Sequence, residues 1–178
     1  MNRNMVEQRT EDLFRGGLHC AEAVFQAVLE GAGAADVSPR VASAFGGGIG
    51  RSKLGMCGAL SGGLMALGIL RGRDSGREPW DETAELAEGL FLRFKGDYGC
   101  TRCPAVLENL GPQDRMDKCI RLAGRTAGMV VEALAGGLSE DPALRPAKAC
   151  GCGCADLHAP VPSVSSTTPA PKSACGCK

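Results

Sequence analysis

The feature that most constrains the fold is a run of fifteen residues, 56–70 (MCGALSGGLMALGIL), in which Ser61 is the single polar side chain. A helix of this length spans roughly 22 Å, which is short for a bilayer core of about 30 Å. A helix that is apolar on every side must instead be enclosed by other elements. We therefore expect a buried central helix, with Gly58 and Gly62 one turn apart where a neighbouring backbone or a cofactor comes close.

Helical periodicity dominates the sequence on both sides of this segment, and no segment keeps the alternating pattern of a strand. Ser38 and Pro39 are typical of an N-cap and a first helical turn. Each of the later helices has a stripe of apolar residues expected to face the core, and we expect Trp80 and Met116 to belong to these stripes. The expected helices cover about 4–15, 20–31, 56–70, 78–95 and 113–135, with a further start at Ser38-Pro39. This pattern predicts an all-α domain, a compact bundle of about five or six helices around the central one.

Charge and composition exclude several classes of partner. The chain has 20 basic and 20 acidic residues and few aromatic side chains, so it lacks the basic face expected of a nucleic-acid or anionic-membrane binder. The first twelve residues are polar and contain no signal-peptide core. We therefore expect a cytoplasmic protein with no nucleic-acid or membrane partner.

Ten cysteines in 178 residues indicate metal or redox chemistry in a reducing compartment. They divide the chain into a helical domain, 1–137, and a tail, 138–178. The tail holds six of the ten prolines and no aromatic residue, so we expect it to be disordered. Its alternating Cys-Gly runs suit Cu(I) or Zn(II), with His158 as a further donor. The accessory metal or thiol candidates there are Cys150, Cys152, Cys154, Cys175 and Cys177.

The glycine-rich segment 46–55 lacks the ending of a phosphate-binding loop and the spacing of a dinucleotide-binding loop. One interpretation is a tight loop that needs positive φ at Gly46 and Gly47. The other is a loop whose amides face a bound anion or cluster, with Gly48 and Gly50 as cofactor-binding candidates alongside Gly58 and Gly62. The charges of Arg51 and Lys53 agree with this second interpretation.

Cys57 stands at the start of the central helix, where free N–H groups favour a thiolate of low pKa. Taken alone, Cys20, Cys57 or Cys119 is more simply a small core residue. All three, however, lie at the start or edge of an apolar helical face, which favours a shared inward-facing site.

Cys100 and Cys103 form a C-x-x-C pair followed by Pro104, just ahead of a helix. This spacing suits two thiolates on one metal or a dithiol–disulfide couple. A c-type haem site is excluded because it needs histidine after the second cysteine. His19 is a candidate helix cap or ligand.

These motifs together resemble a known family. The segments Phe14-Arg-Gly-Gly-Leu-His-Cys20, Phe45-Gly-Gly-Gly-Ile-Gly50 and Cys57-Gly-Ala-Leu-Ser-Gly62, followed by Cys103 and Cys119, are similar to the C_GCAxxG_C_C family, which is described as redox-active. The resemblance covers roughly residues 10–135 and implies that Cys20, Cys57, Cys103 and Cys119 act together. Cys100 and the tail cysteines lie outside the family pattern.

Our leading hypothesis is that these four cysteines ligate an iron–sulfur cluster for electron transfer, with Cys100 as an additional candidate ligand. The first alternative is a metal-free thiol–disulfide oxidoreductase, with Cys57 or Cys103 as the attacking thiol. The second is a soft-metal protein acting through the tail. A redox partner protein is expected in the first case, and close packing at Gly58 and Gly62 is either internal or a homodimer contact.

Overall fold

A computed structural model describes residues 1–136, so the tail predicted at 138–178 and its five cysteines lie outside the described residues. The part described is all-α, and its one extended pairing is an isolated antiparallel bridge between Met56 and Arg102. None of its helices has the length and apolarity to cross a membrane. The elements are α1 (Arg3–Arg15), α2 (Cys20–Ala32), the 3-10 helix η1 (Pro39–Phe45), α3 (Gly58–Arg71), α4 (Asp81–Tyr98), α5 (Cys103–Leu110) and α6 (Asp117–Leu134).

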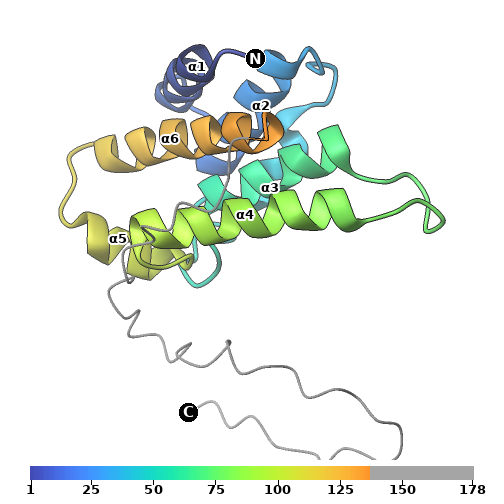
Figure 1. Cartoon of the computed structure of the whole chain (residues 1–178). Helices are drawn as coiled ribbons and strands as arrows, with labels where there is room; N and C mark the ends of the chain where they lie inside the picture. The colour runs from blue at the N-terminus through green and yellow to red at the C-terminus, as the bar shows by residue number, and fades with distance from the viewer. Residues whose placement is uncertain (137–178) are drawn as a thin grey trace, which may run out of the picture.

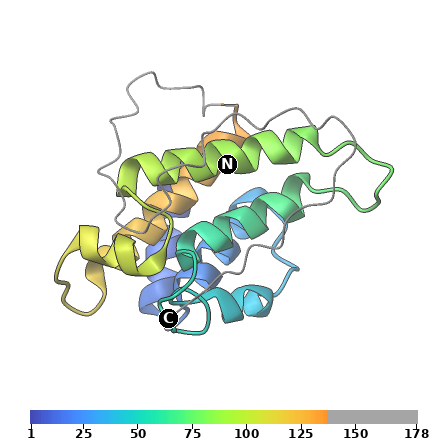
Figure 2. The ribbon, with the colours of Figure 1, turned by 90° about the horizontal axis from the view of Figure 1, so that it is seen from below.

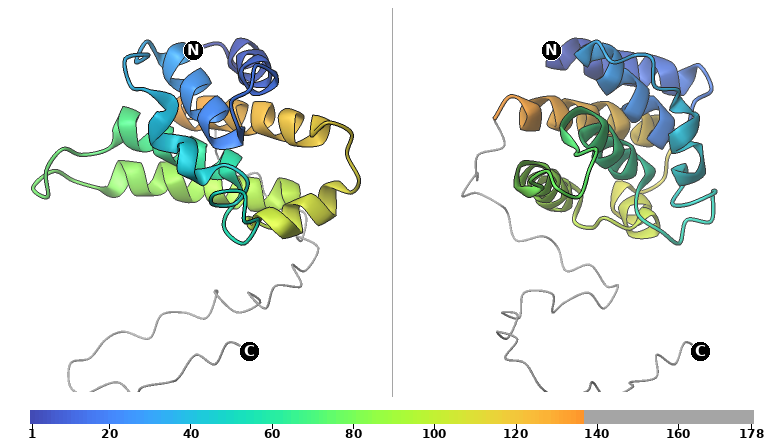
Figure 3. Two further views of the ribbon diagram at one scale, coloured as in Figure 1. Left: turned by 180° about the vertical axis from the view of Figure 1, so that it is seen from behind. Right: turned by 90° about the vertical axis from the view of Figure 1, so that its right-hand side faces the viewer.

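The apolar run forms α3, which packs against α2, α4, α6 and η1 (Figure 1). Its first turns are buried on all sides, while its last turn, which includes Ile69, reaches the surface. The views along and across the bundle show α3 and α6 running in the same direction, with α4 antiparallel to them (Figures 2 and 3). The prediction of a central buried helix is confirmed.

Local sequence signals explain where the helices begin and end. Asn2 caps α1 by accepting a hydrogen bond from the Met5 N–H, and Ser38 caps η1 in the same way. Gly33 and Gly99 end α2 and α4 with φ values of 77° and 76°, a left-handed conformation that costs glycine little. These ends agree with the boundaries expected from sequence to within a few residues.

Two residues assigned to buried stripes lie at the surface instead. Trp80 is 60% exposed because α4 begins one residue later, at Asp81, so Trp80 is outside the helical register. Leu90 and Phe94 are the fully buried residues of α4. Met116 is exposed because it precedes α6 in a left-handed conformation with φ 62°. Both expectations were wrong for the same reason: periodicity applies only within a helix.

Helices α2 and α3 come into close backbone contact in the core. A Cβ built on Gly62 would lie 2.3 Å from the carbonyl oxygen of Ala21, so the two backbones approach as closely as a glycine allows. Gly58, one turn earlier in α3, faces Cys20 at the start of α2. Gly58 and Gly62 therefore allow α2 and α3 of the same chain to pack closely together.

We predict that Gly62→Ala destabilises the domain by about 1–3 kcal/mol, because the added methyl group collides with rigid backbone. Gly68→Ala is the matched control, since it lies in the same helix and a Cβ there meets nothing within 4 Å. The free energy of unfolding of this control should rise by about 0.5–1 kcal/mol, because alanine has a higher helix propensity than glycine. Urea unfolding of the two variants measures both changes, and equal effects would contradict the packing role of Gly62.

Candidate functional site

Four cysteines that are far apart in the sequence line one cavity of about 80 Å³, which we call the cysteine cavity. Each lies at the N-terminal end of a helix. Cys20 and Cys103 are the first residues of α2 and α5, Cys57 is the N-cap of α3, and Cys119 is the third residue of α6. All four are free thiols. The cavity therefore gathers four thiols and four helix N-termini in one place.

The rest of the lining is mainly apolar, with Lys53 and Met116 as its exposed members. Cys100 is buried but is not among the lining residues, so the two cysteines of the C-x-x-C pair do not both face the cavity. The lining is completed by Gly47, Gly58, Val106, Leu107 and Leu122.

A short backbone pairing holds Cys57 and Cys103 side by side. The Cys57 N–H donates to the Thr101 carbonyl at 2.8 Å, and the Cys103 N–H donates to the Gly55 carbonyl at 2.9 Å. These bonds flank the bridge between Met56 and Arg102. The pairing fixes the start of α3 against the start of α5, although 45 residues lie between Cys57 and Cys103 in the sequence.

The glycine-rich loop 46–56 wraps the cavity in an unusual conformation. Five consecutive residues, 47–51, have φ between 55° and 68°, which L residues such as Ile49 and Arg51 rarely adopt. Gly47 has the expected positive φ, whereas Gly46 was wrongly predicted: its φ is −60° because it ends η1 in an extended conformation. The loop is thus a tight turn, as the first interpretation expected, and its Gly47 and Lys53 line the cavity. The second interpretation, in which the amides face an anion or cluster, stays a prediction.

The four glycines proposed as cofactor-binding residues occupy different places. A Cβ on Gly48 would lie 2.5 Å from the Cys103 Cβ, and one on Gly58 would lie 2.5 Å from the Cys20 Sγ. Gly50 faces open space and Gly62 packs on α2. Two of the four positions therefore keep room beside cavity thiols, and the other two do not adjoin them.

Three of the cavity thiols, those of Cys20, Cys57 and Cys103, are difficult to ionise because they are buried. Burial raises the pKa of Cys57, which is 7% exposed, to about 12, although the backbone N–H groups of Ala59 and Leu60 favour its thiolate. Burial also raises the pKa of Cys20 and of Cys103. The low pKa expected for Cys57 from its helix start was wrong, because desolvation outweighs the helix amides.

Gln113 makes a two-point contact with Cys119 that sequence reasoning missed. Its Nε2 group donates to the Cys119 Sγ at 3.3 Å, and its Oε1 atom accepts from the Cys119 N–H at 3.0 Å. The side chain therefore orients this thiol and places a hydrogen-bond donor on its sulfur. No motif marks Gln113, because its partner is set by the turn between α5 and α6.

His19 has the capping role that its position suggested. It is the N-cap of α2, is exposed, and does not line the cysteine cavity. The Glu22 carboxylate accepts a hydrogen bond from its backbone N–H at 2.9 Å. His19 thus contributes to the placement of Cys20 through the helix start.

The described residues contain no group of three or more His, Cys, Asp or Glu arranged to hold a metal ion. Within residues 1–136 the four thiols therefore share one cavity without forming such a group. The predicted Cu or Zn sites of the tail, including His158, fall beyond the described residues.

Comparison with known proteins gives a family match. Residues 18–133 match the family described as "Putative redox-active protein (C_GCAxxG_C_C)". The matched range contains all four cavity cysteines and Gln113 and excludes the tail. No curated protein and no solved structure matches the chain.

We predict that Gly48→Ala perturbs the cavity more than Gly50→Ala. Both glycines have positive φ in the same loop, so each substitution costs about 1–2 kcal/mol of backbone strain. Only the methyl group at Gly48 meets the Cys103 side chain, which adds about 1–3 kcal/mol and displaces the thiol. Urea unfolding, together with the rate of Cys103 alkylation, tests the difference; identical behaviour of the two variants would contradict it.

Proposed function

Because the chain belongs to the C_GCAxxG_C_C family of redox-active proteins, we propose that the four cavity cysteines bind one iron–sulfur cluster through which the protein transfers electrons. The observation that carries this proposal is the meeting of four cysteines, each at a helix N-terminus, around one cavity. Four thiolates are the usual ligand set of [2Fe–2S] and [4Fe–4S] centres.

The helix N-termini provide an environment suited to an anionic centre. A helix N-terminus leaves backbone N–H groups without partners inside the helix and carries the positive end of the helix dipole, although the N–H groups of Cys103 and Cys119 already donate to Gly55 and Gln113. The N–H of Gly47 favours the thiolate of Cys20, and those of Ala59 and Leu60 favour the thiolate of Cys57. Thiolates bound to iron are deprotonated despite their burial, and these amides then offset part of the remaining negative charge.

The arrangement of the thiols favours a cluster over a single ion. One metal ion needs its ligands to converge on a point, and the described residues contain no such group. A cluster binds its thiolates at different iron atoms, so they can be spread around a cavity. Gly48 and Gly58 leave space beside two of these sulfurs, which a side chain at either position would fill. When bound, a cluster accepts and returns single electrons, and the protein positions it, excludes water and tunes its potential.

The metal-free alternative, thiol–disulfide exchange, needs an accessible thiolate to attack a substrate disulfide. Cys57 and Cys103 are both buried, and burial raises the pKa of each thiol. These features favour a protected ligand role for both residues. Reversible two-electron titration of iron-free protein is the behaviour expected of the alternative.

We predict that Cys57→Ser abolishes the visible absorption and removes the iron and acid-labile sulfide of anaerobically purified full-length protein. Cys100→Ser is the matched control, because Cys100 is also buried but does not line the cavity; it should retain all three. Circular dichroism confirms that both variants fold. A coloured Cys57→Ser protein would contradict the ligand role, and iron-free wild-type protein would overturn the cluster proposal.

We also predict that Gln113→Leu lowers the midpoint potential of the centre. The hydrogen bond from Gln113 to the Cys119 sulfur stabilises the more negative reduced state, and its loss at about 1 kcal/mol corresponds to roughly 40 mV for one electron. Gln113→Glu keeps an acceptor for the Cys119 N–H but has no donor for the sulfur, so its potential should fall as well. An unchanged potential in both variants, measured by redox titration, would contradict this role.

A further inference from the structure

The basic residues of the chain are not evenly distributed. Overall the charges balance, yet the 36 residues from Ser38 to Arg73 contain no Asp or Glu. This stretch includes the loop 46–56, which forms a wall of the cysteine cavity. The electrostatic environment on this side of the cavity is therefore more positive than the net charge suggests. The five basic residues of the stretch are Arg40, Arg51, Lys53, Arg71 and Arg73.

The positive charges of the loop are available to a partner. Arg51 and Lys53 are exposed, and neither forms an ion pair with any residue in 1–136. Arg102 adds a third charge, because its Nη2 group donates to the Leu54 carbonyl at 3.1 Å and so lies against the same loop. Like charges on one loop repel one another, and an anionic partner would relieve that repulsion.

The same loop also exposes large apolar side chains. Leu54 is 72% exposed and Ile49 is 47% exposed, and Ile49 adopts φ 68°, a conformation that is rare for a β-branched residue. Apolar side chains with charged residues around them are typical of protein–protein contacts, and weak electron-transfer contacts are among the smallest of these. We call Ile49, Arg51, Lys53, Leu54 and Arg102 the basic loop face.

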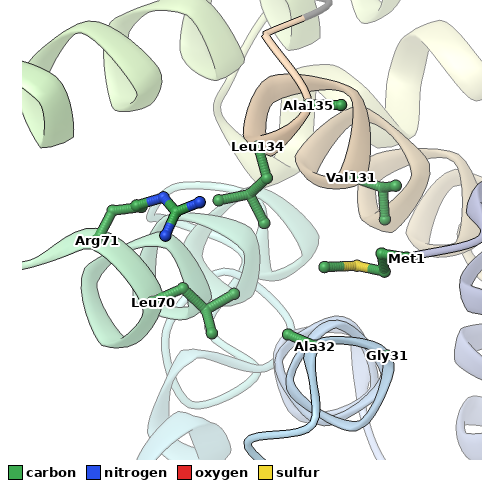
Figure 4. A pocket seen from close by; sticks show the side chains of 8 residues that line it. All are labelled: Met1, Gly31, Ala32, Leu70, Arg71, Val131, Leu134 and Ala135. Atoms are coloured by element: carbon green, nitrogen blue, oxygen red, sulfur yellow. The ribbon is translucent and has the colours of Figure 1, made fainter.

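Two larger cavities suit an electron-transfer partner less well than the basic loop face does. A cavity of about 400 Å³ lies at the C-terminal ends of α2, α3 and α6 (Figure 4), one helix length, or roughly 21 Å, from Cys57. A second, of about 650 Å³, is lined by charges of both signs, including Arg15, Asp114 and Asp117. Of these three surfaces of residues 1–136, the basic loop face is the one that combines a single sign of charge with contact to the cysteine cavity.

We propose that the basic loop face docks an acidic electron-transfer protein, and that electrons pass between the two proteins through this loop. The inference rests on the proposed redox function of the cysteine cavity. In each encounter the reduced centre loses one electron and the oxidised partner gains it, with no atom transferred. Long-range attraction to an acidic partner would speed the encounter and weaken with salt, because the Debye length falls from about 30 Å at 0.01 M to about 10 Å at 0.1 M.

The first test uses small oxidants of opposite charge on the reduced full-length protein. We expect the rate of oxidation by ferricyanide, a trianion, to fall about tenfold between 10 and 200 mM salt, and that by hexaammineruthenium(III), a trication, to rise. Arg51→Glu/Lys53→Glu should reverse both trends, and Arg51→Glu, which leaves the cavity lining intact, should reduce them. Arg73→Glu/Arg77→Glu makes the same charge change at the far end of α3 and should behave like wild type.

The second test asks whether a protein docks, with a plant-type ferredoxin as the acidic probe and cytochrome c as the basic one. Calorimetry at 20 mM salt should show micromolar binding of ferredoxin alone, weakened at least tenfold by Arg51→Glu/Lys53→Glu and unaffected by Arg73→Glu/Arg77→Glu. Charge-selective oxidation without ferredoxin binding would overturn the docking proposal, as would oxidation rates that do not respond to salt. Binding does not need iron. If the anaerobically purified wild-type protein holds no iron but still binds ferredoxin in this charge-dependent way, the docking face is supported and the cluster proposal is overturned.

Discussion

The contact between α2 and α3 is the constraint on which the site depends. Gly62 lies against the Ala21 carbonyl, and one turn away Gly58 lies against the Cys20 sulfur. A side chain at either position would separate the two helices, so the absence of two Cβ atoms brings Cys20 and Cys57 to the same cavity. The first contact is made by rigid backbone and the second by a thiol, which links the stability of the fold directly to the geometry of the site.

The direction of the helices then determines the character of the two ends of the bundle. The helices α2, α3 and α6 all begin at the cysteine cavity and end at the cavity of Figure 4. Parallel helices gather donors and positive dipole ends at one end of the bundle. In the isolated protein this field does not overcome the burial of the thiols, as the raised pKa of Cys57 shows. Bound iron cations would offset the cost of burying the thiolates. The backbone amides would still stabilise the net negative charge of the thiolate-bound centre.

Much of the architecture was predictable because it depends on local signals. The central helix follows from its uniform apolarity, and helix ends follow from Ser38 and Gly33, whose effects extend over a single turn. Errors arose where a residue lay just outside a helix: Trp80 and Gly46 precede or follow an element and take conformations that periodicity does not describe. Sequence periodicity takes into account only residues that are neighbours along the chain, and it does not describe how the ends of an element are placed.

By itself, the sequence determined the class of fold, the cysteines worth considering and the glycines that permit close approach, since each follows from residue type and short spacing. The tertiary structure decided which of these residues come into contact. It placed Cys119 in the cavity and Cys100 outside it, paired Met56 with Arg102, and brought Gln113 onto a cavity sulfur. These outcomes depend on how helices distant in sequence pack together, because burial and hydrogen-bond partners are properties of the assembled core.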